Sequence, residues 1–331
     1  AQQITANTTA QANAQYQVVA PGATAITVTL PATATLAVGN TVAVSGGGAG
    51  TAPWNVVPNV GQTITTLGVA GNVAPGTTWV PRLAPTQWHW IASSTTGDIL
   101  VAASIPGNLY TSTDGGATWI PGNSPTASWI SVDMTPNAER IVAVAYGGNM
   151  FQSVDRGVTW TQITSPTVDL TDREFESITI SQNGQRIAVH VLNDGIFVSQ
   201  DGGGTWARAT AAGGGVLSSG WRGIDSPADG AFLMAVSQDQ EVYVSVDAGA
   251  TWTARPVTVG GTAFAEDWYR VAMSDNGGVI AMAANTFGGA AGTALYITRD
   301  QGLTWTRNTT LSGDFTSIDV SADGTMMLVT L

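Results

Sequence analysis

The feature that most limits the fold of this 331-residue chain is a short motif that recurs five times. It reads Ser-x-Asp-x-Gly-x-Thr-Trp, with Thr in place of Ser in the last copy. The copies occupy residues 112–119, 153–160, 199–206, 245–252 and 298–305. A repeat at a spacing of roughly 20 to 50 residues indicates a fold made of stacked supersecondary units.

The residue types of this motif are typical of a hairpin turn. An Asp in a tight turn accepts hydrogen bonds from the backbone of the turn itself. The Gly adopts positive φ, and the Trp buries a large apolar face. We therefore expect a structural role in joining two outer strands for Asp114, Asp155, Asp201, Asp247, Asp300, Trp119, Trp160, Trp206, Trp252 and Trp305.

A second periodic feature precedes the motifs. An aromatic residue stands six positions before the Ser, Thr or Pro that opens each predicted turn, at Trp88, Trp129, Phe175, Trp221, Trp268 and Phe315. Each of these aromatic residues is expected to begin the first, or inner, strand of a repeat. There are thus six expected inner strands for five motifs. The missing motif is predicted at residues 72–79, where Gly76, Thr78 and Trp79 persist but Ala74 replaces the Asp.

This arrangement predicts an all-β fold, a six-bladed β-propeller. Its last blade would combine residues 62–81 with residues 315–331, so that the two ends of the array close the ring and leave no unpaired edge. The expected domains are a β-rich module over residues 1–61 and the propeller over residues 62–331. In the alternative, the natural protein continues past Leu331 and the sixth blade is completed there.

The motif resembles the Asp-box, or BNR, repeat of sialidases, sortilin-type receptors, some glycanases and photosystem II assembly factors. The resemblance covers about residues 72–331, and stretches such as 109–114 look most like the assembly-factor type of repeat. It implies a propeller in which the boxes lie at blade peripheries and take no part in chemistry. Function therefore has to be read from other residues.

Composition excludes several classes of function. The net charge of −12 disfavours a nucleic-acid partner, because a phosphate backbone would be repelled. With no Cys and only two His, we expect no metal site and no cofactor. No apolar run reaches the length of a membrane-spanning helix, so membrane insertion is not expected.

The first 81 residues contain no Asp, Glu, Lys, Arg or His. Uncharged strands rich in Thr, Asn and Gln pair with neighbouring chains without desolvating a charge. We therefore expect self-association through residues 1–61, which resemble a small β-module of phage fibres and bacterial surface proteins. The alternative is a flexible leader of about 15 residues before a small β-domain.

The candidate site lies at the starts of the inner strands, where loops converge at one mouth of a propeller channel. The residues expected to share this rim are His89, Trp90, Glu176, Arg222, Tyr269 and Arg270. Arg side chains bind carboxylates, as sialidases require, and Tyr269 and Glu176 match the nucleophile pair by type. The Phe-Arg-Ile-Pro motif of that family is missing, so no catalytic residue is assigned, and solvated salt bridges are the alternative.

These features predict a non-enzymatic structural or interaction protein, displayed on an extracellular, cell-surface or virion assembly such as a filament, sheath or fibre. Its partners would be other copies of the chain, a glycan or another surface protein. Two alternatives stay open. One is a carbohydrate-active enzyme or glycan-binding propeller, similar to sialidases, that uses the channel mouth. The other is an assembly factor resembling those of photosystem II.

Overall fold

The computed structural model describes residues 87–330, apart from residues 216, 218–219, 286–293 and 309–314, together with six short strands among the first 57 residues. The chain forms two compact units, Ala1–Pro81 and Arg82–Leu331. Strands and turns make up the described residues, with no helix among them, which confirms the all-β prediction. It follows that no described segment forms a helix long and apolar enough to cross a membrane.

The first unit contains two small parallel sheets. One has the order β1 (Gln2–Ile4), β3 (Ala14–Val18) and β5 (Val42–Gly46). The other has the order β2 (Thr8–Thr9), β4 (Ile26–Thr29) and β6 (Trp54–Val57). Strands of the two sheets alternate along the chain, so the connection within each parallel pair contains a strand of the other sheet.

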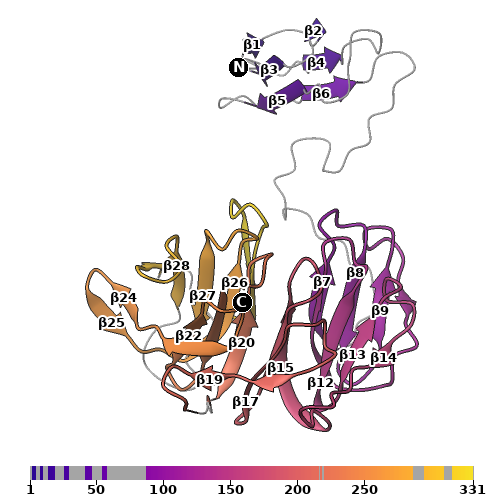
Figure 1. Ribbon diagram of the computed structural model, residues 1–331. Coiled ribbons are helices and arrows are strands. Elements are labelled where there is room, and N and C mark those ends of the chain that lie inside the picture. Colours follow the sequence, from indigo (N-terminus) through magenta and orange to yellow (C-terminus); the bar gives the residue numbers. More distant parts are fainter. Residues whose placement is uncertain are drawn as a thin grey trace. The chain divides into compact units, whose positions relative to one another are not determined.

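The second unit is a succession of antiparallel sheets formed from consecutive strands, and we name each sheet by its first strand (Figure 1). The β7 sheet contains β7 (Trp88–Ser93), β8 (Leu100–Ser104), β9 (Leu109–Ser112) and β10 (Ile120–Pro121). The β11 sheet contains β11 (Trp129–Met134), β12 (Ile141–Gly148), β13 (Met150–Ser153) and β14 (Thr161–Gln162). The β15 sheet contains β15 (Arg173–Ile180), β16 (Ile187–Val191), β17 (Gly195–Ser199) and β18 (Ala207–Arg208).

The chain continues in the same way through the rest of this unit. The β20 sheet contains β20 (Trp221–Asp225), β21 (Leu233–Ser237), β22 (Val242–Ser245) and β23 (Thr251–Ala254), with β19 (Thr210–Ala211) added beside β23. The β26 sheet contains β26 (Trp268–Met273), β27 (Ile280–Ala284), β28 (Ala294–Thr298) and β29 (Thr306–Asn308). A hairpin of β24 (Val257–Val259) and β25 (Thr262–Phe264) precedes it, and the pair β30 (Ser317–Val320) and β31 (Met327–Thr330) follows.

The core of this unit lies between neighbouring sheets. Each buried apolar cluster takes side chains from two successive sheets, as in the cluster that joins Val244 of the β20 sheet to Tyr296 of the β26 sheet. The aromatic residues that begin the inner strands are central to it, since Trp129, Phe175 and Trp221 are each 0% exposed. Removing a buried aromatic side chain of this size costs about 3 to 5 kcal/mol. Side-by-side packing of the sheets is therefore the main source of stability.

Each motif forms the same turn, which we call the box turn. In the copy at residues 153–160, the hydroxyl of Ser153 donates to Asp155 Oδ1 at 2.8 Å. Thr159 donates to the same carboxylate through its backbone N–H at 2.8 Å and through its hydroxyl at 2.5 Å. The Trp160 indole donates to the carbonyl of Gly157 at 3.1 Å, and that glycine adopts a φ of 84°. These contacts recur in the other four copies with the equivalent residues.

Two sequence-based expectations fall on residues outside the described set. The degenerate motif at residues 72–79 lies there, as does the first part of the shared blade at residues 62–81. The division of the chain into compact units falls between Pro81 and Arg82. We predicted a domain boundary after residue 61, because residues 62–81 were assigned to the propeller. The shared blade therefore stays a prediction.

Candidate functional site

A β-bulge stands at the start of the inner strand in each four-stranded sheet of the second unit. The pairing register shifts between Trp88 and Trp90, and at the equivalent place in the β11, β15, β20 and β26 sheets. The bulged residues are His89, Ile130, Glu176, Arg222 and Tyr269. A bulge places an extra residue against its partner strand and redirects its side chain, and bulges are frequent beside active sites. The backbone thus gives the predicted rim residues a shared local geometry.

The centre of the site is an ion pair between adjacent inner strands. Arg222 Nη1 of β20 lies 3.3 Å from Glu176 Oε1 of β15, and both side chains are largely buried. The guanidinium also donates to Gln238 Oε1, at 2.9 Å from Nε and 2.5 Å from Nη2. Burial raises the pKa of Glu176, while the positive charges of Arg222 and Arg270 oppose that rise. The pKa of Glu176 therefore lies above that of an ordinary glutamate, so a larger fraction of this carboxyl is protonated at a given pH.

A second guanidinium lies beside this pair, and its hydrogen-bond acceptors among the described residues are all neutral. Arg270 is 6% exposed, and its Nη1 donates to the carbonyls of Arg222 at 3.0 Å and Tyr269 at 3.2 Å. Its Cζ lies 4.1 Å from the ring centroid of Tyr269 and 5.3 Å from that of Trp90, a stabilising cation–π geometry. Gly223 permits this close packing, since a Cβ there would meet the backbone nitrogen of Val271 at 3.2 Å.

Both histidines lie close enough to Arg270 for its charge to affect their pKa values. His89 is exposed, and its Nδ1 lies 2.9 Å from the carbonyl of Ile130. Partial desolvation and the charge of Arg270 lower the pKa of His89, against the effect of that hydrogen bond. His190 on β16 is 0% exposed, and neither ring nitrogen has a hydrogen-bond partner among the described residues. Burial and the charges of Arg270 and Arg222 lower the pKa of His190 to about 3, so its ring is neutral at neutral pH.

A second carboxylate lies next to Glu176. Glu174 stands two residues earlier on β15, is exposed and pairs in register with Tyr146 of β12. Partial desolvation raises the pKa of Tyr146, and the carboxylates of Glu174 and Glu176 raise it further, whereas Arg222 lowers it. Tyr146 therefore has both carboxylates and a guanidinium as its charged neighbours. The mouth of the site holds two acids, a phenol and an arginine.

The structure brings together five of the six residues that we predicted for the rim, whereas the contact of the sixth, His89, is with the carbonyl of Ile130. Glu176, Arg222, Tyr269 and Arg270 contact one another in sequence along three inner strands. Trp90 reaches Arg270 from the β7 sheet. Sequence reasoning missed His190 and Tyr146, because both lie on second strands and join the cluster only through packing between sheets. We call the set of Trp90, Tyr146, Glu174, Glu176, His190, Arg222, Tyr269 and Arg270 the rim cluster.

A different set of acids lines the inner strands further from their starts. Asp133 Oδ2 accepts the backbone N–H of Ile180 at 2.8 Å, and Asp225 Oδ2 accepts that of Met273 at 2.8 Å, so each carboxylate joins two sheets. Burial raises the pKa of Asp133 to about 6, and it raises the pKa of Asp225 and of Asp319 as well. Within the described part of the chain, no three His, Asp or Glu side chains gather closely enough to hold a metal ion.

Comparison with solved structures places this chain among β-propellers. The crystal structure of an ancestral GH74 enzyme matches with a TM-score of 0.58 and 19% identity, over 76% of this chain and 35% of that enzyme. The GH74 xyloglucanase of Xanthomonas campestris matches with a TM-score of 0.53 and 18% identity, over 71% of this chain and 42% of that enzyme. YCF48 from Cyanidioschyzon merolae matches with a TM-score of 0.45 and 15% identity, over 73% of this chain and 92% of that protein.

No protein-family model matches the sequence, and no curated protein sequence matches it. The chain spans less than half the length of the two GH74 enzymes, so the likeness concerns one part of those proteins. It nevertheless corrects the prediction of a non-enzymatic structural or virion protein, because solved structures that share the fold are glycoside hydrolases. That prediction relied on the repeat and on the uncharged N-terminus, and neither feature determines chemistry at the strand ends.

Proposed function

We propose that this protein is a carbohydrate-active propeller that binds a glycan at the rim cluster and hydrolyses a glycosidic bond there. Glu176 is the proton donor and Glu174 is the second carboxylate. The observation that carries the proposal is the environment of Glu176, a largely buried carboxyl with a raised pKa beside an exposed acid. Glycosidases use such a pair, in which burial keeps one member protonated.

The spacing of the two acids suits this chemistry. The bulge at Glu176 interrupts the regular alternation of side chains, and the carboxylate of Glu174 is close enough to raise the pKa of Glu176. Catalytic carboxyl pairs are about 5 to 9.5 Å apart, depending on whether the reaction retains or inverts the anomeric configuration. Tyr146 supports the geometry, since it has both Glu174 and Glu176 as charged neighbours. Trp90 and Tyr269 supply aromatic surface of the kind that sugar rings pack against.

The proposal includes the finer architecture. Six sheets of Asp-box, or BNR, type would form a closed ring, with residues 62–81 completing the sheet that β30 and β31 begin. The exposure of Ile91 supports closure of the ring. Its side chain is 59% exposed, whereas the equivalent residues Val132 and Ile224 are 1% and 4% exposed. A further sheet packed against β7 would cover it. Self-association through residues 1–61 and an extracellular, cell-surface or virion location stay predictions that no observation here tests.

A panel of soluble glycans tests the proposed activity. The full chain is incubated with xyloglucan, mixed-linkage β-glucan, polygalacturonate and sialyllactose, and release of reducing ends or free sugar is measured against pH. Hydrolysis of one class, abolished in Glu176→Gln and kept in Glu139→Gln, supports the proposal. Glu139 is an exposed acid in the turn between β11 and β12 and makes a matched control. Equal activity of the two variants would show that the rim cluster is not the site.

A further inference from the structure

The sheets of the second unit pack side by side, and we call each place where two successive sheets meet a junction. Five junctions each contain one buried apolar cluster, from the β7 and β11 sheets up to the β26 sheet and the β30–β31 pair. The remaining junction, between the β30–β31 pair and the β7 sheet, has no such cluster among the described residues. We call this junction the seam. The closed ring proposed above requires the seam to close.

Both sides of the seam carry apolar side chains of a kind that the other junctions bury. Leu328, the second residue of β31, is 50% exposed. The second residue of the second strand in each of the other sheets is at most 3% exposed and packs toward the following sheet, at Val101, Val142, Ala188, Met234 and Ala281. Across the seam, Ile91 of β7 is exposed as well, whereas its equivalent Val132 shares a buried cluster with Val101. Contact between Leu328 and Ile91 would reproduce this packing.

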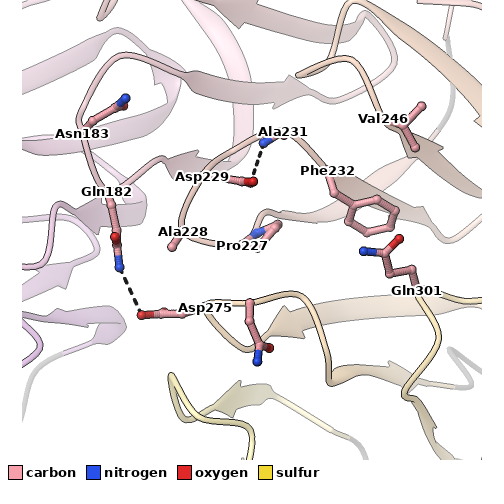
Figure 2. Close-up of a pocket in the computed structure, with 11 residues that line it drawn as sticks. Gln182, Asn183, Pro227, Ala228, Asp229, Ala231, Phe232, Val246, Asp275 and Gln301 are labelled. Carbon is pink, nitrogen blue, oxygen red and sulfur yellow. Dashed lines mark hydrogen bonds between the residues drawn. The ribbon is translucent and has the colours of Figure 1, made fainter.

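Backbone hydrogen bonds also join the turns that connect the first and second strands of neighbouring sheets. The N–H of Gln182 donates to the carbonyl of Ala228 at 2.7 Å, and the N–H of Ala228 donates to that of Asp275 at 2.8 Å. Figure 2 shows these three residues on adjacent turns, where the side chains of Gln182 and Asp275 are also joined at 3.2 Å. The series continues from the N–H of Asp275 to the carbonyl of Ala322 at 3.0 Å.

The series stops at the seam. The equivalent turn of the β7 sheet carries Thr95, whose N–H donates to the carbonyl of Pro136 at 2.8 Å. Neither the N–H of Ala322 nor the carbonyl of Thr95 has a hydrogen-bond partner among the described residues. Each is the group that the series would use next. A single bond from Ala322 to Thr95 would therefore continue the series across the seam.

Carboxylates on the inner strands of alternate sheets form a third kind of contact between sheets. Asp133 Oδ2 accepts the N–H of Ile180 in the following sheet, and Asp225 Oδ2 accepts that of Met273, both at 2.8 Å. Asp319 of β30 is the third acid at this strand position, two sheets after Asp225. The sheet that would follow it in a closed ring is the β7 sheet, so its bridge would cross the seam.

Half of this bridge is already in place. Asp319 Oδ1 accepts the N–H of Val320 at 2.8 Å, whereas no partner of Oδ2 lies among the described residues. The equivalent N–H in the following sheet belongs to Ser93 of β7. Ser93 pairs with the first residue of its second strand, as Ile180 does in the β15 sheet. The repeat therefore assigns the N–H of Ser93 to Asp319 Oδ2.

We propose that the seam closes by direct packing of the β30–β31 pair on the β7 sheet, with Asp319 as the latch that holds it. The carboxylate of Asp319 accepts the N–H of Ser93, and the N–H of Ala322 donates to the carbonyl of Thr95. The exposed apolar side chains on both sides then become buried. Closure also fixes β7, the strand that carries Trp90 to the rim cluster. This inference rests on the closed ring proposed above and names the contacts that close it.

Paired cysteines test the seam in the full chain, which has no Cys of its own. The seam pair is Thr95→Cys with Ala322→Cys. The matched reference is Gln182→Cys with Ala228→Cys, because these turns already form the hydrogen bond expected across the seam. After equilibration in glutathione buffer, free thiols and intact mass are measured. We expect an intramolecular disulfide in both pairs, with equilibrium constants within about tenfold of each other.

A pair on distant turns sets the background. Ala228→Cys with Ala322→Cys lies on turns two sheets apart and should form no intramolecular disulfide. A seam pair that behaves like this control would overturn the proposal, because the two turns would not meet. Disulfide-linked dimers of the seam pair, without the intramolecular bond, would overturn it as well, since a second copy would then cover the seam.

Asp319→Asn tests the latch in the seam-pair background. Asn has one acceptor oxygen, so it cannot serve the N–H groups of both Val320 and Ser93. We expect the disulfide equilibrium constant to fall at least about tenfold, because a hydrogen bond to a charged group is lost. Glu139→Gln should leave it unchanged. An unchanged constant in Asp319→Asn would overturn the latch. No readout here depends on hydrolysis, so this inference and the proposed function fail separately.

Discussion

Arg222 Nη1 lies 3.3 Å from Glu176 Oε1, and this ion pair joins the inner strands β20 and β15 at the mouth of the rim cluster. Both residues occupy bulged positions, so the same backbone irregularity directs them toward each other. The pair has a chemical consequence. Arg222 opposes the rise in the pKa of Glu176 that burial causes, and it thereby sets the pH range in which the carboxyl can donate a proton.

Removal of the Arg222 charge should move the pH dependence of hydrolysis. A proton donor is active while protonated, so the basic limb of the rate profile reports its pKa. An opposite charge at this distance lowers a carboxyl pKa by about 1 to 3 units in well-coupled pairs. In Arg222→Gln we expect the basic limb of kcat to move up by about one unit. The control Arg299→Gln changes an exposed arginine in a box turn and should leave the pH profile unchanged. An unshifted basic limb in Arg222→Gln would show that Arg222 does not affect the proton donor.

His190 should make the protein sensitive to acid. The unfolded chain protonates this side chain below about pH 6.5, whereas the folded chain does so only below about 3. The unfolded state therefore binds more protons in this range, and the free energy of unfolding falls as pH drops from about 6.5 to about 3. The loss amounts to as much as roughly 4 kcal/mol.

The variant His190→Phe keeps a planar aromatic ring, somewhat larger than imidazole, and removes the titrating group. Denaturant unfolding at pH 7, 5 and 4 should show a smaller acid loss in this variant than in the parent chain. His89→Phe, at the exposed histidine, serves as the control and should keep most of the parent's acid loss, since the large pKa shift belongs to His190. If His190→Phe lost as much stability in acid as the parent chain, groups other than His190 would cause the loss of stability at low pH.

The box turns should contribute to stability through their carboxylates. Asp247 accepts hydrogen bonds from the Ser245 hydroxyl at 2.7 Å and from Thr251, at 2.9 Å from its N–H and 2.6 Å from its hydroxyl. Asp247→Ala should lower the free energy of unfolding by about 1 to 2 kcal/mol at pH 7. Glu139→Ala, on the exposed surface, should change it by less than about 0.5 kcal/mol. Equal effects of the two substitutions in chemical denaturation would mean that the box carboxylate is dispensable.

Closure of the ring predicts that Ile91 is covered. If residues 62–81 pack against β7, Ile91→Ala should cost about 2 kcal/mol or more, as a buried isoleucine does. Ile224→Ala provides the reference, since Ile224 is its equivalent in the β20 sheet and is 4% exposed. A cost for Ile91→Ala below about 0.5 kcal/mol, beside a large cost for Ile224→Ala, would indicate that this side of β7 is open.

The fold could be predicted from the sequence because its signals are local. The hydrogen bonds that shape a box turn, from the Ser153 hydroxyl to the Trp160 indole, lie within eight residues, so composition and spacing reveal them. The rim residues could be selected because equivalent positions in a repeat point the same way. Their bulges and the burial of His190 depend on how neighbouring sheets pack, and no local pattern encodes them. The prediction of a non-enzymatic protein was wrong for a related reason. A repeat specifies the architecture, whereas function depends on the residues at the strand ends.

The most direct test of the account is the rate of glycan hydrolysis by Glu176→Gln relative to the parent chain, on the glycan that the panel identifies. The substitution keeps the shape of the side chain and removes the proton that would reach the leaving oxygen. We predict a kcat lower by at least about a hundredfold, in the range that general acid catalysis contributes, with an unchanged KM and an unchanged unfolding midpoint. A folded Glu176→Gln protein that retains the parent kcat would contradict the assignment of the active site to the rim cluster.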